Sequence, residues 1–169
     1  MSGGPRIVLR SAIPADRPFL ARVYASTREA ELAQVPFTPE QRAAFVAQQF
    51  DAQSRHYAEH YHDTSFDVIE VDGVPAGRLI VGRWTREIRV VDIALLAEHR
   101  GRGVGSRVLA PVLAEADERG VPATIHVETF NPAQRLYHRL GFREVSREAV
   151  YLKLERPVGV GRVEAAGGA

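Results

Sequence analysis

The sequence predicts an α/β fold, and three observations lead to this class. Residues 88–96 are mostly apolar, and a glycine-rich stretch, 100–106, joins them to an amphipathic stretch, 104–119. The same order of strand, turn and helix recurs between residues 123 and 140. Further upstream, an Asp-Gly pair at residues 72–73 separates two apolar runs and indicates a β-hairpin. Strands that alternate with helices, beside a hairpin, are typical of a sheet covered by helices.

The N-terminal half is expected to hold one strand and two helices before that hairpin. Thr38 and Gln41 have the spacing of a capping box, and Pro39 between them suits the first position of a helix. A long helix is therefore predicted to start at this point. The expected elements are a strand at 7–10, a helix from 14 to about 31–35, a helix at 40–60, and hairpin strands at 65–71 and 74–82.

The C-terminal half is expected to alternate strands and helices. Asn131 suits a helix N-cap, Pro132 the first helical position and Gly141 the C-terminal stop. Residues 156–169 are rich in Gly and Ala and lack an apolar period, so we expect a mobile tail there and one domain over residues 6–155. The expected elements are a strand at 88–96, a helix at 104–119, a strand at 123–128, a helix at 132–140, and strands at 142–146 and 148–154.

The composition excludes several classes of protein. The chain has 169 residues, which suits one domain with a sizeable core. Its formal net charge of +1 gives no general reason to expect a nucleic acid or a membrane as partner. The absence of cysteine excludes disulfides, thiolate metal sites and a cysteine nucleophile. No apolar stretch reaches the ~20 residues of a membrane span and the start lacks a signal pattern, so a cytoplasmic protein is expected.

We predict a diphosphate cradle in the stretch Arg100-Gly101-Arg102-Gly103-Val104-Gly105-Ser106. Glycine lacks a Cβ atom, so such a turn can adopt positive φ and let a ligand approach the main chain. The helix that follows starts with unpaired N–H groups, and these donors and the helix dipole favour an anion. The two arginines and the serine hydroxyl add donors suited to phosphate oxygens.

Two familiar phosphate-binding loops fit this stretch poorly. A Walker P-loop needs lysine before its serine or threonine, whereas Gly105 precedes Ser106 here. A Rossmann fingerprint needs a third glycine where Ser106 stands, although Glu128 at the end of the next strand could supply its acidic residue. The Rossmann interpretation is therefore weak rather than excluded, and a plain helix-start turn with surface arginines also stays open.

A third loop type, R/Q-x-x-G-x-G/A, is matched without a gap by Arg100, Gly103 and Gly105. Downstream, residues 131–142 match the pattern N-x-x-A-x-x-L-Y-x-x-x-G-F. With both motifs in this order, the sequence resembles the GNAT superfamily of acyl-CoA-dependent N-acyltransferases. The resemblance covers the C-terminal half well and the N-terminal half in outline.

The resemblance implies a mixed sheet flanked by helices, with its central strands splayed to admit the pantetheine of acetyl-CoA. The cradle, Arg100 to Ser106, would hold the pyrophosphate. The backbone of Ile93, Ala94 and Leu95 would pair with the pantetheine and offer an N–H to the oxyanion. Asn131 would reach the pantetheine arm, or would cap a helix instead. Tyr137 matches the tyrosine that protonates the leaving thiolate, whereas its structural role would be that of a packed aromatic. No metal is required.

The base that takes the amine proton is less defined. Asp92 is an acid within an apolar strand, where a carboxylate needs partners, so it faces either structural donors or the acceptor amine. Glu128 is a weaker candidate, Glu87 fits a turn residue, and His126 in a strand fits a structural role. His56 and His60 have metal-ligand spacing, but no partner pattern accompanies them, which favours a solvated helix face. Deprotonation relayed by water also stays open.

The sequence therefore predicts an N-acetyltransferase that moves an acetyl group from acetyl-CoA to a primary amine of a small molecule or peptide. A non-catalytic acyl-CoA-binding sensor is the alternative from another class, and only turnover separates the two. The acceptor and the length of the acyl group are not encoded in these motifs. An exposed edge among the last strands would offer a route to a homodimer.

Overall fold

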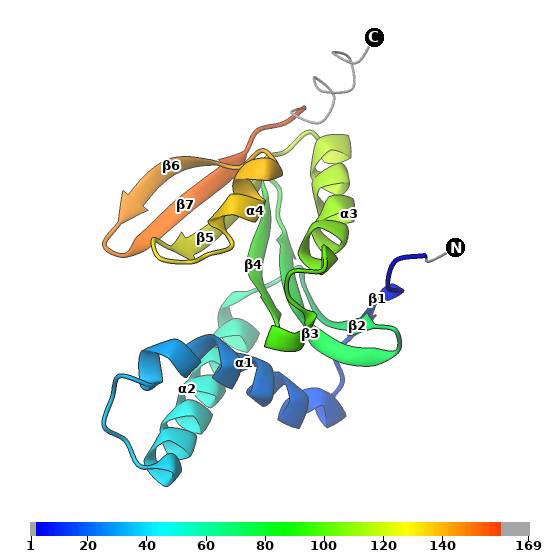
Figure 1. Ribbon diagram of the computed structural model, residues 1–169. Coiled ribbons are helices and arrows are strands. Elements are labelled where there is room, and N and C mark those ends of the chain that lie inside the picture. The colour runs from blue at the N-terminus through cyan, green and yellow to red at the C-terminus, as the bar shows by residue number, and fades with distance from the viewer. Residues whose placement is uncertain (1–2, 160–169) are drawn as a thin grey trace. The chain divides into compact units, whose positions relative to one another are not determined.

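The computed structural model describes residues 3–159 (Figure 1). The chain divides into two compact units, and each unit is built from two segments. Unit 1 runs to Leu79 and takes up again over Ile93–Arg100, whereas unit 2 covers Ile80–Asp92 and continues from Gly101. The predicted tail begins within the described chain, but its residues 160–169 lie outside it.

The predicted α/β class is confirmed, because helices flank a sheet with strand order β1-β2-β3-β4-β5-β7-β6. The sheet is mixed, since β4 and β5 are parallel while β1–β2, β5–β7 and β6–β7 are antiparallel. The elements are β1 (Ile7–Ser11), the short 3₁₀ turn η1 (Pro14–Asp16), α1 (Arg17–Leu32), α2 (Pro39–His60), β2 (Thr64–Val71), β3 (Val74–Arg83), β4 (Ile88–Leu95), η2 (Ala97–His99), α3 (Val104–Arg119), β5 (Ala123–Glu128), α4 (Gln134–Arg139), β6 (Arg143–Glu148) and β7 (Tyr151–Arg156).

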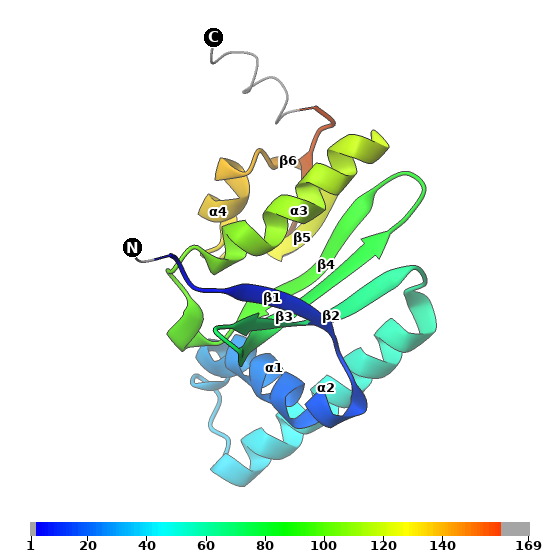
Figure 2. The ribbon, with the colours of Figure 1, turned by 90° about the vertical axis from the view of Figure 1, so that its right-hand side faces the viewer.

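In unit 1, α1 and α2 lie on the same side of β1, β2 and β3 (Figure 2). Val23 of α1 is fully buried in a core cluster with Ala94 and Leu96. Tyr24 of α1 packs against Phe50 of α2 with ring centroids 5.8 Å apart, and this pair joins the two helices. The predicted capping box of α2 is confirmed, because Thr38 and Gln41 exchange hydrogen bonds of 2.9 and 3.1 Å.

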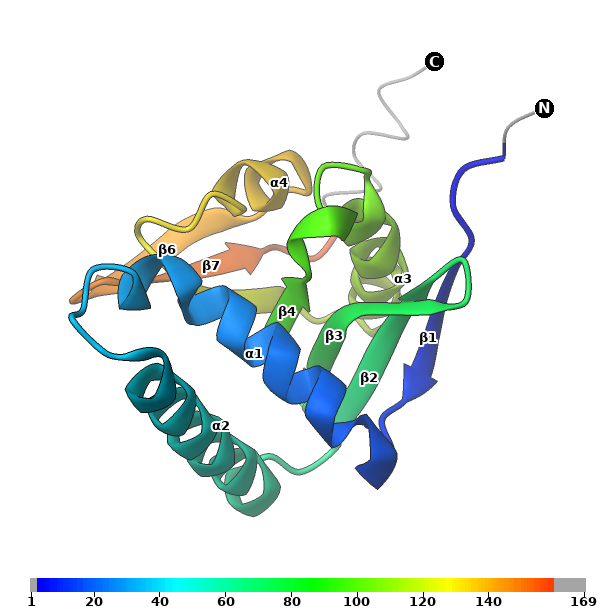
Figure 3. The same ribbon diagram turned by 60° about the horizontal axis from the view of Figure 1, so that its bottom comes forward.

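In unit 2, α3 and α4 lie on the same side of β5 (Figure 2), and α4 lies beside the β6–β7 hairpin (Figure 3). The bounds of α3 and β5 agree with the sequence prediction to the residue. Arg156, which the prediction placed at the start of the tail, is instead the last residue of β7. Its guanidinium is buried, binds Asp117 of α3 at 2.9 Å and donates to the Leu140 carbonyl at 2.9 Å. This ion pair fastens the end of β7 to α3.

The parallel ladder between β4 and β5 is short. It joins residues 88–90 to residues 123–125, whereas β4 continues to Leu95 and β5 continues to Glu128. The two strands therefore part after Val90, as the resemblance implies for the central strands of the sheet.

Strand β6 lies at one edge of the sheet, and all six of its residues are exposed. Its sequence is mostly charged, and its pairing with β7 is interrupted by a register shift between Glu144 and Ser146. Charges and bulges are the features by which proteins discourage pairing at an exposed edge. The predicted homodimer has no support from this strand and stays a prediction.

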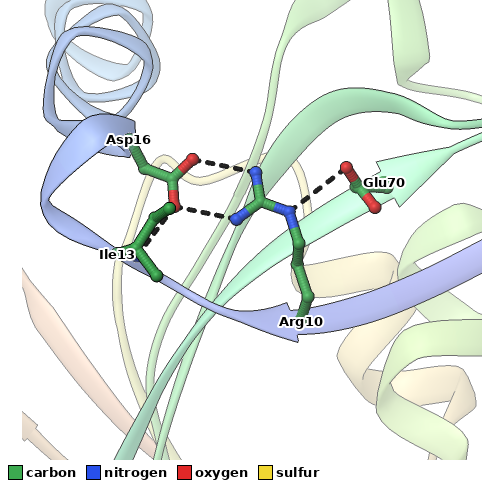
Figure 4. Close-up of polar contacts among 4 residues, drawn as sticks. All are labelled: Arg10, Ile13, Asp16 and Glu70. Carbon is green, nitrogen blue, oxygen red and sulfur yellow. Dashed lines mark hydrogen bonds and ion pairs between the residues drawn. The ribbon is translucent and has the colours of Figure 1, made fainter.

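The link between β1 and α1 depends on one ion-pair cluster (Figure 4). Arg10 donates two hydrogen bonds of 2.8 Å to Asp16 and one of 3.2 Å to Glu70 on β2. Asp16 also accepts the backbone N–H of Ile13 at 2.8 Å. These hydrogen bonds, chiefly those from Arg10, hold the pKa of Asp16 at about 2, below its ordinary value of 3.8.

We expect Asp16→Asn to lower the stability of the protein at neutral pH but not in strong acid. The pKa of Asp16 is lower in the folded chain, so its contribution is present above pH 3.8 and is lost as the pH falls through about 2. The measurement is the urea midpoint of the parent and the variant at pH 7 and at pH 2.

Asp51→Asn is the matched control, because Asp51 pairs with Arg17 through exposed side chains and such pairs contribute little. A midpoint for Asp16→Asn equal to that of Asp51→Asn at pH 7 would contradict the role given to this cluster.

Candidate active site

The cradle has the backbone that its glycines predict. Gly101 and Gly103 have φ of 72° and 77°, in the left-handed region where a side chain is unfavourable. A Cβ atom at either glycine would meet nothing within 4 Å, so the space above the turn is open. Gly103 is the N-cap of α3, and its carbonyl accepts the N–H of Arg107 at 3.2 Å.

The first turn of α3 offers N–H groups to a ligand. The N–H groups of Val104, Gly105 and Ser106 precede the first intrahelical hydrogen bond. In the described chain no side chain caps this end, and the first turn contains no acidic residue. The partial positive charge at the start of α3 is therefore uncompensated, which suits an anion.

Gly105 has a different role from the two left-handed glycines. A Cβ atom at this position would lie 3.0 Å from Cδ2 of Leu136, on α4. Glycine at this point therefore lets the first turn of α3 approach α4 closely. The cradle thus contains one glycine that helix packing requires, Gly105, and two that the backbone conformation requires, Gly101 and Gly103.

The two loop arginines are exposed, but Arg100 has a partner within the protein. Its Nε donates to the Leu95 carbonyl at 2.9 Å and so closes the turn after β4. Arg102 lies between the left-handed glycines. The structure thus gives Arg100 a structural contact, whereas its predicted contact with phosphate stays a prediction.

The segment Ile93–Leu95 lies at the end of β4. Ala94 is buried in the core of unit 1. A Cβ atom on Gly77 would lie 2.1 Å from the Ala94 carbonyl oxygen, so Gly77 allows the backbone of β3 to approach this segment. This close approach of two backbones explains the glycine within β3.

Tyr137 lies on α4 and is 3 % exposed. Its ring meets Phe142 edge-on with centroids 6.1 Å apart, and its hydroxyl has no hydrogen bond to any described residue. Burial raises the pKa of Tyr137, and the negative charges of Asp92 and Glu128 raise this pKa further. The phenol is therefore protonated at neutral pH, and two carboxylates act on it electrostatically.

The structure thus brings together three residues that the sequence singled out separately. Asp92, Glu128 and Tyr137 all belong to unit 2, and both carboxylates act electrostatically on the tyrosine. Along β4, Asp92 shares a face with Ile88 and Val90, which are buried. A carboxylate close to a proton donor is an arrangement suited to acid–base chemistry.

The model of the acetyltransferase (GNAT) family matches residues 26–142 of this chain, which is more than half of it. The chain belongs to the GNAT family. Among curated proteins, none matches the sequence significantly.

Several solved structures share the GNAT fold with this chain. The PaiA N-acetyltransferase from Thermoplasma acidophilum, solved in complex with coenzyme A, is 14% identical with a TM-score of 0.69, over 90% of this chain and 99% of its own. An acetyltransferase from Thermus thermophilus is 23% identical with a TM-score of 0.65, over 90% and 97% of the two chains. Ard1 from Thermoplasma volcanium is 20% identical with a TM-score of 0.58, again over 90% and 97%. At these identities the likeness concerns the fold.

The turn that follows β5 in this GNAT protein differs from the prediction. A helix was expected over 132–140, but α4 starts only at Gln134, because Asn131 Oδ1 accepts the N–H of Ala133 at 2.8 Å and forms a turn there. The N-cap of α4 is Ala133, and no side chain of the described residues caps this helix, so the predicted N-cap role of Asn131 is wrong. Its side-chain oxygen forms a local turn instead. Its contact with the pantetheine stays a prediction.

Sequence reasoning missed Gln134. Its side-chain amide donates to the carbonyls of Glu128 and Thr129 at 3.2 and 2.7 Å, so it fixes the backbone at the end of β5. Since Glu128 acts on Tyr137, Gln134 positions one of the charges of the site. The sequence signal that could have revealed this role is the position of Gln134 shortly after the Asn-Pro pair.

The remaining candidates have structural partners. Glu87 accepts hydrogen bonds from Thr124 and Arg89, which supports a structural role. His56 and His60 stack with ring centroids 4.4 Å apart on the exposed face of α2. Among residues 3–159, no group of three or more His, Cys, Asp or Glu side chains is arranged to hold a metal ion. In the same part of the chain, no helix combines the length and apolar character that a membrane span requires.

Proposed function

We propose that this GNAT protein is an N-acetyltransferase that moves the acetyl group of acetyl-CoA to a primary amine of a small molecule or peptide. A single domain that includes residues 6–155 is part of this proposal, and Arg156, the last residue of β7, belongs to it rather than to a tail. The observation that carries it is the pairing, within unit 2, of an uncapped glycine-rich helix start with a buried, protonated Tyr137. The complex of the PaiA relative with coenzyme A supports the choice of donor.

The cradle would hold the pyrophosphate of coenzyme A. The N–H groups of Val104, Gly105 and Ser106 point their partial charges at the anion, and Arg100 and Arg102 add full charges. Gly101 and Gly103 leave the open space that the phosphates need. The backbone of Ile93–Leu95 would pair with the pantetheine, and Asn131 would contact the arm through its remaining amide group. Bound acetyl-CoA supplies an activated carbonyl. The protein therefore needs only to position the two substrates, deprotonate the amine and protonate the leaving thiolate.

Asp92 takes the proton of the attacking amine, since an ammonium ion has no lone pair with which to attack. An N–H of Ile93, Ala94 or Leu95 donates to the oxyanion that develops on the carbonyl. Tyr137 gives its proton to the leaving thiolate. Glu128, which acts on the same tyrosine, is the second candidate for the base.

The charges around Tyr137 couple the two proton transfers. Burial is the main cause of the raised pKa of Tyr137, and the charge of ionised Asp92 raises this pKa further. When Asp92 accepts the amine proton, its charge is neutralised and the pKa of Tyr137 falls. The tyrosine thus becomes a stronger acid at the stage at which a thiolate, with an ordinary pKa near about 8.5, must be protonated.

The function is tested with a panel of amines in an assay that follows free coenzyme A with a thiol reagent. The chain has no cysteine, so every thiol detected comes from the cofactor. Release that depends on an added amine supports the proposal. Binding of acetyl-CoA without release for any amine would instead indicate the non-catalytic sensor.

We predict that Ser106→Glu weakens coenzyme A binding by about 10-fold or more without destabilising the protein. A carboxylate in the first turn of a helix interacts favourably with the dipole, by about 0.3–1 kcal/mol, but occupies the donors that the phosphates would use. Calorimetry with coenzyme A and a thermal melt give the two quantities.

Ala110→Glu is the control for Ser106→Glu, because Ala110 is exposed one turn further along α3. Equal loss of affinity in both variants would show a general charge effect rather than a cradle.

We expect Tyr137→Phe to lower turnover by about 10²-fold or more, with affinity for acetyl-CoA nearly unchanged. The substitution removes the proton donor and keeps the ring that packs against Phe142. Steady-state kinetics and calorimetry on the same preparation separate the two effects. Parental turnover in the variant would remove Tyr137 as the acid and leave the cofactor assignment in place.

Asp92→Asn should lose activity chiefly at low pH, because the acceptor is then an ammonium ion that no base deprotonates. Raising the pH supplies free amine and should restore part of the rate. The measurement is the pH–rate profile beside the melting temperature, with Glu128→Gln as the matched variant. A profile parallel to that of the parent, with a lower melting temperature, would assign Asp92 a structural role only.

A further inference from the structure

A shallow hollow on the β5–β7–β6 part of unit 2 has no role in the mechanism above. Its volume is about 420 Å³, which is within the range of about 300–1,000 Å³ for sites that hold small molecules. Its lining comes from three strands and consists of His126, Ser146, Glu148, Ala149, Tyr151 and Lys153.

The strand register explains why these side chains converge. Lys153 on β7 lies opposite His126 on β5 and opposite Ser146 on β6, so the three form one row across the sheet. Tyr151 lies in the same way between Glu128 and Glu148, in a second row. The rows are two residues, about 7 Å, apart along the strands and point to the same face.

The hollow lies beside the open part of β5. Ile125 is the last residue of β5 that pairs with β4, and both rows lie beyond it. Glu128, in the second row, is also one of the two carboxylates that act on Tyr137. A ligand in the hollow would therefore lie next to the end of β5, which carries Glu128, one of the two carboxylates of the proposed site.

The charges of the hollow fit an amine that carries an acid. Lys153 is the only lysine of the chain, is half-buried, and has no ion pair with any described residue. Burial lowers the pKa of His126, and the positive charges of Arg89 and Lys153 lower it further. The negative charge of Glu87 has the opposite but smaller effect, so the surroundings of His126 are electropositive. Lys153 therefore offers an ammonium group without an ion-pair partner in the described chain to the hollow, and a carboxylate from a ligand would form a charge-assisted hydrogen bond with it.

Glu148 makes the hollow unsuitable for a simple anion. It lies in the second row and, like Lys153, pairs with no charged group in residues 3–159. A simple amine would be repelled by Lys153, and a multiply charged anion would be repelled by Glu148. A zwitterion satisfies both groups.

We propose that the hollow binds the acceptor of the transferase as a small amino acid, with Lys153 holding its carboxylate and Glu148 attracting its ammonium group during binding, before the base of the proposed mechanism takes the proton. This inference rests on the proposed N-acetyltransferase function and narrows its acceptor class. Lys153 is a specificity-determining residue in this arrangement, because it distinguishes an amino acid from the corresponding uncharged amide.

The test measures coenzyme A release with alanine, glutamate and phenylalanine, each compared with its amide. We expect the parent to prefer the acid form of at least one pair by about 10-fold or more in kcat/KM. Lys153→Gln should abolish that preference, whereas Lys153→Arg should retain most of it. Arg147→Gln, which removes a cation that pairs with Glu144 on the same hairpin, should leave it unchanged. A variant Lys153→Gln that slows acid and amide equally would overturn the inference.

A second measurement separates failure of this inference from failure of the proposed function. Protein labelled with ¹³C-lysine gives side-chain signals from one residue, Lys153, and these are followed during titration with the same amino acids and amides. Saturable shifts with the acids alone would support amino-acid binding in the hollow, even if no amine releases coenzyme A. The absence of release would overturn the proposed transferase function instead. Release at equal rates for acids and amides, without a shift, would overturn the hollow and leave the transferase standing.

Discussion

The early end of the ladder between β4 and β5 determines how the chemistry of unit 2 is arranged. Beyond Ile125 the backbone of β5 loses β4 as a partner, and backbone polar groups need other partners when they are buried. The end of β5 obtains them locally, since Gln134 and the N–H of Asn131 both donate to the Glu128 carbonyl. The turn that follows the end of the ladder therefore leads directly into α4, the helix that carries Tyr137. The separation of the strands and the position of Tyr137, the proposed acid, thus depend on the same stretch of chain.

The same region concentrates charge in a way that a stable core alone would not require. Asp92 and Glu128 both act on a tyrosine that is almost completely buried. Carboxylates beside a buried phenol oppose its ionisation, so they preserve a proton rather than release one. This agrees with the proposed role of Tyr137, in which the phenol keeps its proton until the thiolate forms. A purely structural tyrosine would more simply be packed among apolar side chains.

The sequence predicted best those elements whose ends are determined by local backbone chemistry. Helix α3 was predicted to the residue because Gly103 and Gly120 adopt the left-handed conformation at its two ends. The start of α4 was predicted two residues too early, since Asn131 can form a side-chain turn as readily as a helix cap, and sequence alone does not distinguish them.

Contacts between distant residues were not accessible from the sequence. The ion pair of Arg156 with Asp117 spans 39 residues, and Arg156 had been assigned to the tail from local composition alone. Lys153 likewise gains its significance only from strand register, which places it between His126 and Ser146. The roles expected of Asp92, Ile93–Leu95 and the cradle rest on family resemblance and on the charges now observed around Tyr137, so they remain proposals.

The strand order of unit 2 has a consequence for how the protein is made. Strand β7 lies between β5 and β6, although among residues 3–159 it is the last strand to be synthesised. Until it is in place, β5 and β6 have no shared neighbour, and Asp117 lacks the arginine that fastens the end of the sheet to α3. Domains generally fold as units during synthesis. This sheet cannot close before almost the whole described chain has emerged, so a ribosome that stops short of residue 156 releases a chain in which the sheet of unit 2 is unfinished.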